Sequence, residues 1–490
     1  MKNLTTLLIV TLAIFLMACQ PKTIEEQSIL ALHPENSNYF IYKEKPTILV
    51  TSGEHYGAVM NADFNFEKYL SALKKDGLNY TRIFLGPYSE IGDNTFGISN
   101  NTMNPKPESW LTPWVKDTVT NKYDLDKWND DFFKRIKAFV AKASENDIIV
   151  EVTLFTSYYT DHQWSTSPFH PKNNIQGIDS ISFKQVNTLN NGKLLAIQEN
   201  YVRKVVTELN EFGNITFEIQ NEPWADNPLF VEKILETDTL THPFAWQKIV
   251  ETNNQSSDEW HRKISAIITD EEKQLPNQHL IARNISNFRC KIVNPDPNVS
   301  IYNFHYAYPE AAFLNLDLKK AIGLDKTGFM PHNDLNYRSQ AWKFMLAGGA
   351  LYNNLDYSFT VGSEDGTHAI DAGTPGWGGT QYRAQLKVLK DFMESFNFIK
   401  MKPDNSILQV MKGNITSFQV LAETGRQYAI YIENPTGATI ELQVPDGDYR
   451  TEWISPVTGI LEAGTKMTAM GGVLEINCPP GDDFVLKVRL

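Results

Sequence analysis

Short apolar runs alternate with longer amphipathic stretches between Tyr39 and about residue 400. The runs are rich in β-branched and aromatic residues, and the stretches between them repeat apolar residues at helical spacing. This pattern predicts eight strands, within residues 46–55, 79–88, 148–155, 214–223, 279–286, 299–309, 321–328 and 351–360. It also predicts five helices, within residues 66–77, 128–147, 193–213, 256–275 and 335–350.

Strands that alternate with helices form parallel crossover units. Eight such strands over residues 38–400 predict a (β/α)8 TIM barrel with insertions in its loops. The alternative is a doubly wound open sheet, which normally carries a glycine-rich phosphate-binding turn after its first strand. Here the first strand ends in Ser52-Gly53-Glu54-His55, which is no such turn.

The pattern changes after about residue 400. Six short segments, such as "QYAIYIEN" and "DFVLKVRL", alternate apolar and polar residues, and turn-forming residues such as "PDGD" and "PPGDD" separate them. Even spacing of short strands predicts an accessory β-sandwich over residues 401–490.

The first 19 residues have the pattern of a secretory signal. Lys2 precedes an apolar run from Leu4 to Met17, which is too short for a comfortable transmembrane helix. The following Ala18-Cys19 resembles the lipobox of bacterial lipoproteins, which implies lipidation of Cys19 and a lipid anchor in the cell envelope. An ordinary signal peptide with a chance cysteine is the alternative. Gln20 favours the outer membrane or cell surface, and residues 20–37 are interpreted as a tether.

Composition narrows the function. The 490 residues carry a net charge of −13, and no basic stripe is present to neutralise phosphates, which argues against nucleic acid as a partner. Aromatic residues make up 12% of the chain and fit either core packing or a groove for sugar rings.

No HExxH or paired-histidine motif occurs, so we expect no metal and no cofactor. We also expect a monomer.

Polar side chains gather where the predicted strands end. In a TIM barrel these ends form the face that carries the active site. The residues at or just beyond these ends are Glu54, His55, Arg82, Asn221, Glu222, His305, Tyr306, Tyr308, Asp325, Lys326, Asp356 and Tyr357, with Glu364 and Asp365 in the last loop.

"FEIQNEP" on the fourth strand resembles the acid/base motif of clan A glycoside hydrolases, the retaining (β/α)8 glycosidases. Arg82 and the His-Tyr pair at 305–306 match that clan too, and the segments "YFIYKEKPTILVTSGEHYGAVMN" and "LAGGALYNNLDYSFTVGSEDGT" resemble a cellulase-like branch of bacterial secreted proteins. The resemblance implies a secreted glycosidase that cleaves an oligo- or polysaccharide by double displacement, with Glu222 as acid/base.

The same resemblance implies roles for the neighbouring residues. Asn221 would bond the sugar 2-hydroxyl, Arg82 would orient the nucleophile, and His305 would lie on the same rim. Trp224, Tyr306 and Tyr308 would form the sugar platform.

The seventh strand departs from the clan pattern. The nucleophile, a glutamate in the clan, is replaced by Lys326 in "AIGLDKTGF". Asp325 could be the carboxylate if the alignment shifts by one residue, although strand alternation would point it away from the site. Glu364 could instead reach in from the last loop as a second carboxylate. The third alternative is a catalytically degenerate lipoprotein that binds carbohydrate without cleaving it.

Overall fold

The computed structural model describes residues 28–92, 94, 96–234, 247 and 249–490. The predicted signal peptide, Cys19 and the first part of the predicted tether lie outside these residues. The rest of that segment packs on the barrel, where Leu30 is buried and its N–H donates to the carbonyl of Gly213. A small sheet follows, made of β1 (Ala31–Leu32), β2 (Phe40–Tyr42) and β3 (Lys45–Thr47).

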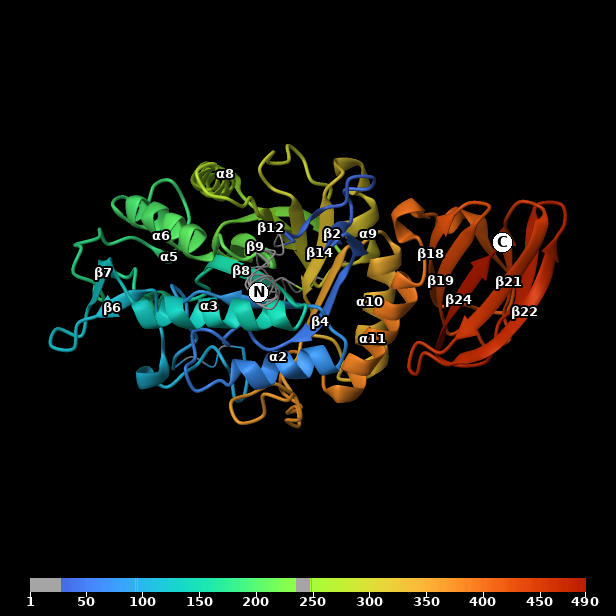
Figure 1. Cartoon of the computed structure of the whole chain (residues 1–490), viewed down its shortest axis with the longest axis horizontal. Helices are drawn as coiled ribbons and strands as arrows, with labels where there is room; N and C mark the ends of the chain where they lie inside the picture. Colours follow the sequence, from blue (N-terminus) through green and yellow to red (C-terminus); the bar gives the residue numbers. More distant parts are fainter. Residues whose placement is uncertain (1–27, 93, 95, 235–246, 248) are drawn as a thin grey trace, which may run out of the picture.

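Eight parallel strands form the predicted barrel, with helices around them (Figure 1). In chain order they are β4 (Leu49–Gly53), β5 (Tyr80–Phe84), β8 (Ile149–Thr156), β9 (Ile215–Asn221), β12 (Leu280–Asn287), β13 (Ile301–His305), β14 (Ala321–Lys326) and β15 (Leu351–Leu355). Their order in the sheet is β4-β15-β14-β13-β12-β9-β8-β5. Asn79 nearly closes the ring, because its N–H donates to the Val50 carbonyl and its Oδ1 accepts from the Val50 N–H. The predicted fold class is confirmed.

Helices cover the outside of the barrel. The predicted ones are α2 (Phe66–Lys75), α3 (Asp130–Glu145), α6 (Leu194–Leu209), α8 (Gln255–Glu272) and α10 (Asp334–Leu346), and α4 (Asp161–Thr166), α5 (Phe183–Val186), α7 (Pro223–Asp226) and α9 (Pro309–Phe313) are short additions. The side chain of Asn65 caps α2 by accepting from the Lys68 N–H. The sequence prediction omitted α11 (Thr380–Glu394), although its apolar residues recur at helical spacing. No described helix is long and apolar enough to span a bilayer.

Two hairpins interrupt the barrel pattern and were not predicted. One pairs β6 (Trp114–Lys116) with β7 (Tyr123–Trp128). The other pairs β10 (Pro228–Lys233) with β11 (Ile249–Asn253), and β11 joins the end of β12 through an antiparallel bridge between Thr252 and Ser286. This second hairpin therefore extends one side of the barrel mouth.

The C-terminal segment forms the predicted sandwich of antiparallel sheets. One sheet has the order β16-β18-β19-β24-β21-β22 and the other β17-β20-β23. The strands are β16 (Lys402–Pro403), β17 (Leu408–Lys412), β18 (Ser417–Glu423), β19 (Gln427–Glu433), β20 (Thr439–Gln443), β21 (Gly447–Ile454), β22 (Leu461–Ala469), β23 (Val473–Asn477) and β24 (Asp483–Arg489). Trp453 belongs to the core between them.

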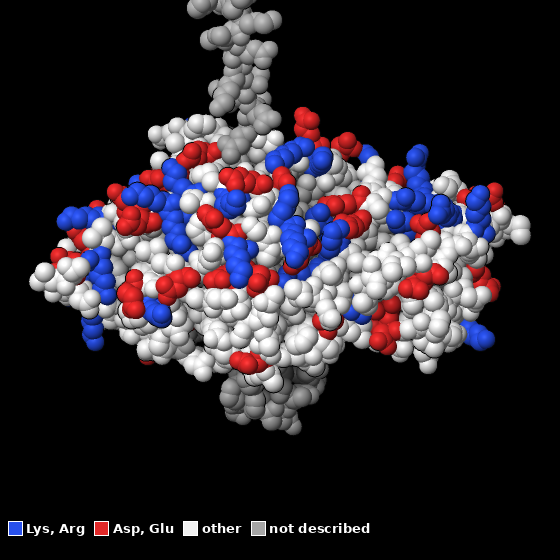
Figure 2. Space-filling model, turned by 60° about the horizontal axis from the view of Figure 1, so that its bottom comes forward, with Lys and Arg blue, Asp and Glu red and all other residues white. Residues whose placement is uncertain are grey.

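Charges of both signs are interspersed on the face shown in Figure 2. Lys and Arg side chains alternate there with Asp and Glu side chains and form no continuous basic stripe. This face therefore offers no track for a phosphate backbone.

Helix α10 joins the barrel to the sandwich, and in Figure 1 it lies between them. The ring of Trp342 stacks on that of Tyr431, with centroids 5.9 Å apart. Arg338 forms a bidentate ion pair with Asp483, with both N–O distances 2.8 Å and side chains only 6% and 3% exposed. The two domains therefore share a buried charged contact.

We predict that Arg338→Ala lowers the free energy of unfolding by about 3–5 kcal/mol, because Asp483 would remain buried without its cation. Lys343→Ala is the control, since Lys343 pairs with Glu433 in a more exposed setting and its loss should cost less than about 1 kcal/mol. Urea denaturation followed by circular dichroism measures both. Equal costs for the two variants would contradict the prediction.

Candidate active site

Glu222 lies at the point where β9 turns into α7. Its backbone is left-handed, with φ 48° and ψ 54°, a conformation that is uncommon for a residue with a side chain. Two contacts hold this turn: the Glu222 N–H donates to Asn284 Oδ1 at 3.0 Å, and the Glu222 carbonyl accepts from Ser157 Oγ at 2.7 Å. A strained turn that other side chains fix in place is typical of a functional site.

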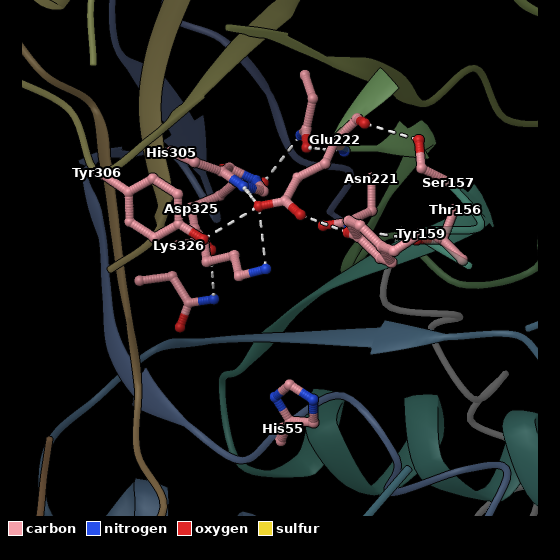
Figure 3. A network of polar contacts seen from close by, with 12 residues as sticks. His55, Thr156, Ser157, Tyr159, Asn221, Glu222, His305, Tyr306, Asp325 and Lys326 are labelled. Carbon is pink, nitrogen blue, oxygen red and sulfur yellow. Dashed lines mark hydrogen bonds and ion pairs between the residues drawn. The ribbon is translucent and has the colours of Figure 1, made fainter. Parts of the chain in front are cut away.

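Four side chains donate to the Glu222 carboxylate (Figure 3). Three converge on Oε1: His305 Nδ1 at 2.7 Å, Tyr306 Oη at 3.1 Å and Lys326 Nζ at 3.0 Å. The hydroxyl of Tyr159 donates to Oε2. The donors come from the end of β13 and the residue after it, the end of β14 and the loop after β8, so closure of the barrel brings them together.

These donors control the charge of Glu222. Burial alone would raise the pKa of the carboxyl group, but the ammonium of Lys326 opposes it, and the Lys326 and Glu222 side chains are only 14% and 8% exposed. The charge of His305 and hydrogen bonds from His305 and Tyr159 act in the same direction. Together they hold the pKa of Glu222 well below its usual range, so the group is an ionised carboxylate.

A β-bulge shapes the end of β14. Phe304 pairs with Leu324 and His305 pairs with Lys326, which leaves Asp325 as the extra residue. The bulge interrupts the strand alternation on which the expected orientation of Asp325, away from the site, was based. Asp325 is fully buried inside the barrel, and its Oδ1 lies 3.1 Å from His305 Nε2. It supports the far side of the imidazole that contacts Glu222.

Arg82 lies beneath the site among buried carboxyl groups. Its Nε is 2.9 Å from Glu218 Oε2 and 3.3 Å from Glu151 Oε1, and its Nη2 is 3.5 Å from Asp325 Oδ2. Its Nη2 also donates to Asn221 Oδ1 at 3.1 Å. Arg82 thus supports the site from within the barrel and orients Asn221.

The carboxyl groups of Glu151, Glu218 and Asp325 are close enough to hold a metal ion, with oxygens within 4.8 Å of one another. Arg82 already supplies positive charge at this place, so the cluster does not require an ion. Burial raises the pKa of Glu151 well above its usual value and that of Glu218 to about 7. Although burial opposes it, the charges of His305 and Arg82 hold the pKa of Asp325 below its usual value. These shifts favour the protonated form of Glu151 and the ionised form of Asp325.

A cavity of about 710 Å³ opens above this layer. Such a volume suits a ligand the size of a short saccharide. Its aromatic walls offer faces on which sugar rings can pack. These rings are Tyr56, Phe84, Tyr88, Phe96, Tyr159, Trp224, Tyr306, Phe329 and Tyr357.

The structure brings most of the predicted site residues together. Those that line the cavity are Asn221, Glu222, Trp224, Tyr306 and Lys326. The edge of Trp224 packs against the His305 ring, with centroids 5.2 Å apart. Three further predicted residues lie beneath the cavity and contact the residues that line it or their neighbours. His305 bonds Glu222, Arg82 bonds Asn221, and Asp325 lies against His305.

Glu364 and Tyr308 do not line this cavity. The Glu364 carboxylate accepts from the N–H groups of Asn65 and Gly362, at 3.3 and 2.9 Å, and so ties the last loop to the start of α2. Tyr308 precedes α9 and packs on Phe288, with ring centroids 5.5 Å apart. Glu364 is therefore not placed to act with Glu222.

Sequence reasoning missed much of the cavity wall, including three residues with polar groups that bear on the chemistry. Tyr159 follows the third barrel strand by three residues, and the aromatic pair in "TSYYTD" was a readable signal for it. Glu90 lies in the loop after β5, where Tyr88 Oη donates to it at 3.1 Å and His55 Nε2 lies 3.2 Å away. Glu251 lies on the unpredicted hairpin strand β11.

Comparison with solved structures finds a similar fold in glycoside hydrolases. The chain is similar to a glycoside hydrolase with a TM-score of 0.61 and 14% identity, over 94% of this chain and 96% of that one. It is also similar to a glycoside hydrolase family 5 protein from Bacteroides vulgatus, with a TM-score of 0.61 and 13% identity, over 94% and 93% of the two chains. No protein-family model and no curated protein matches the sequence. The resemblance to clan A glycoside hydrolases is confirmed at the level of fold.

We predict that Lys326→Met raises the pKa of Glu222, because the charge that lowers this pKa most is removed from beside a buried carboxylate. The titration can be followed through the carboxyl ¹³C shift of glutamate-labelled protein, with Glu222→Gln assigning the resonance. Lys343→Met removes a lysine that pairs with Glu433 instead and should leave the titration of Glu222 in place. An unchanged Glu222 titration in Lys326→Met would show that the ammonium does not control it.

Proposed function

We propose that this protein is a glycoside hydrolase that cleaves O-glycosidic bonds of an oligo- or polysaccharide. The observation that carries the proposal is the Glu222 carboxyl group, which accepts from four donors in an aromatic cavity at the carboxyl ends of the barrel strands. In TIM-barrel enzymes this face carries the chemistry. The glycosidase fold supports the same class of reaction.

The surroundings of Glu222 favour a role that differs from the one the clan motif implies. A general acid must hold a proton, whereas four donors keep Glu222 ionised. An ionised, oriented carboxylate is the nucleophile of a retaining double displacement. In this proposal a Glu222 oxygen attacks the anomeric carbon and forms a glycosyl ester, which water then hydrolyses.

Lys326 then has a role at the place where the clan has its nucleophile. Its ammonium lies 3.0 Å from Glu222 Oε1 and stabilises the attacking group before the reaction and after the ester breaks. His305 and Tyr306 bond the same oxygen, which leaves Oε2, to which Tyr159 alone donates among the described residues, as the attacking atom.

A second candidate function is carbohydrate binding without cleavage, and the same ion pair favours it. An ammonium bonded to Glu222 offers no second carboxylate where the clan pattern has one. The cavity and its aromatic rings would then bind the carbohydrate without cleaving it.

The sequence also supports a cellular location for the protein. We propose secretion, lipidation at Cys19 and anchorage to the bacterial envelope, with the outer membrane or cell surface favoured by Gln20. The protein would act there as a monomer on saccharides outside the cell.

We predict that the wild-type protein hydrolyses at least one member of a panel of 2,4-dinitrophenyl glycosides, and that Glu222→Gln lowers kcat by on the order of 10⁴-fold or more. The loss follows from removal of the attacking carboxylate. Glu364→Gln, a glutamate outside the cavity, should keep the wild-type rate. Release of dinitrophenolate measures all three proteins.

Calorimetry with the corresponding oligosaccharides separates the two candidate functions. Binding without any turnover by the wild type, together with hydrolysis gained by Lys326→Glu, would contradict the hydrolase proposal and support binding alone. Turnover by the wild type that Glu222→Gln abolishes would exclude the binding-only function.

A further inference from the structure

Cleavage of a glycosidic bond needs a proton donor for the leaving oxygen unless the leaving group is already a good one. The proposed hydrolase function leaves that role open, because Glu222 is ionised and Lys326 occupies the other catalytic position of the clan. The donor must reach the same cavity as Glu222. The inference below rests on the proposed function.

Among the described residues that line the cavity, three carry a carboxyl group: Glu90, Glu222 and Glu251. Glu90 already has its partners, since Tyr88 Oη donates to it at 3.1 Å, His55 Nε2 lies 3.2 Å away and Asn101 also donates to it. Although burial opposes it, the charge of His55 and these hydrogen bonds lower the pKa of Glu90. Glu90 is therefore an ionised, fully engaged group and a poor proton donor.

Glu251 differs from both other carboxyl groups. It is half-buried in the cavity wall on β11. No described side chain forms an ion pair or hydrogen bond with its carboxyl group, whereas its backbone N–H donates to Asn287 Oδ1 at 2.7 Å. A carboxyl group in a cavity with a fixed backbone and no partner in the protein is available to a ligand.

The fold holds Glu251 on the Glu222 side of the mouth. Strand β11 packs against α7, the turn that directly follows Glu222, and the N–H of Asn254 donates to the Asn227 carbonyl at 2.8 Å. The neighbouring Val250 packs in a cluster with Tyr306, whose hydroxyl bonds Glu222. The residue before Glu251 thus packs in the cluster that includes Tyr306, and Glu251 itself lines the same cavity as Glu222.

We infer that Glu251 is the proton donor of the proposed reaction, with Glu222 as its nucleophilic partner. In the first half, the Glu251 O–H gives its proton to the glycosidic oxygen, the bond from the anomeric carbon to that oxygen breaks, and Glu222 forms the ester. In the second half, Glu251 takes a proton from water, the water oxygen bonds to the anomeric carbon, and the ester bond breaks to restore the Glu222 carboxylate. Both residues return to their starting states.

The electrostatics of the two groups agree with these roles. Burial raises the pKa of Glu251, whereas Lys326 and His305 hold that of Glu222 down. When two carboxyl groups share a site, the one that burial keeps from water holds its proton and can act as the acid. The one surrounded by donors stays ionised and can act as the nucleophile.

The test compares leaving groups. Phenyl and 2,4-dinitrophenyl glycosides of glucose, mannose, xylose and galactose are assayed with the wild type and Glu251→Gln. The phenyl glycoside needs protonation and should lose about 10²–10⁴-fold in kcat/KM. The dinitrophenyl glycoside needs none and should lose less than about tenfold, since its leaving group departs unaided. Its kcat should nevertheless fall, because water attacks the ester without the Glu251 base. Added azide should restore this kcat and yield a glycosyl azide, because azide attacks the ester without a base.

Glu232→Gln is the matched control, because Glu232 lies on the other strand of the same hairpin and pairs with Arg289. It should retain wild-type rates on both substrates. Equal losses on both leaving groups in Glu251→Gln, no loss at all, or a leaving-group dependence in Glu90→Gln instead would overturn the assignment of Glu251.

The two proposals fail in different ways. If the wild type cleaves no glycoside of either series, both the hydrolase function and the Glu251 assignment are overturned. If the wild type is active and Glu222→Gln is not, while Glu251→Gln retains its phenyl glycoside activity, only the assignment of Glu251 falls.

Discussion

The ion pair between Glu222 and Lys326 is the interaction on which the rest of the site depends. It joins the ends of two barrel strands that lie far apart in sequence, and it keeps a buried carboxylate charged. A buried ion pair of this kind is stable only if its remaining hydrogen-bonding positions are filled. Tyr159, Tyr306 and His305 fill them on the Glu222 side. The chemistry we propose follows from that constraint, because the charged form of Glu222 can attack an anomeric carbon and cannot donate a proton.

A second layer of charge supports the first from inside the barrel. Asp325 lies against the far nitrogen of His305, and Arg82 bridges Asp325 to the other buried carboxyl groups while it orients Asn221. Functional groups keep their geometry when the groups behind them are fixed in this way. The bulge at Asp325 connects the two layers, because it lets adjacent residues of one strand serve both the interior and the cavity.

The sequence predicted the barrel strands well, but it predicted the loops and hairpins between them poorly. All eight barrel strands could be predicted from apolar periodicity, and Glu222 and His305 followed because strand ends in such a barrel share one face. The place of Asp325 beneath the site, against His305, could not be predicted because a bulge leaves no trace in an alternating pattern. The hairpin that carries Glu251 on β11 was missed because its first strand, β10, with exposed Leu229 and Phe230, lacks the alternation that marks a half-buried strand. Cavity walls made by loops and hairpins depend on contacts between distant segments, which local patterns do not encode.

Trapping of the covalent intermediate tests the central claim most directly. A 2-deoxy-2-fluoro glycoside with a dinitrophenyl leaving group, made for the sugar that the protein accepts, slows hydrolysis of the ester so that it accumulates. Mass spectrometry of the intact protein and of its peptides then locates the added sugar. The account predicts one fluoroglycosyl group per chain, on the peptide that contains Glu222. A label on any other side chain, or turnover of the parent glycoside with no label at Glu222, would contradict it.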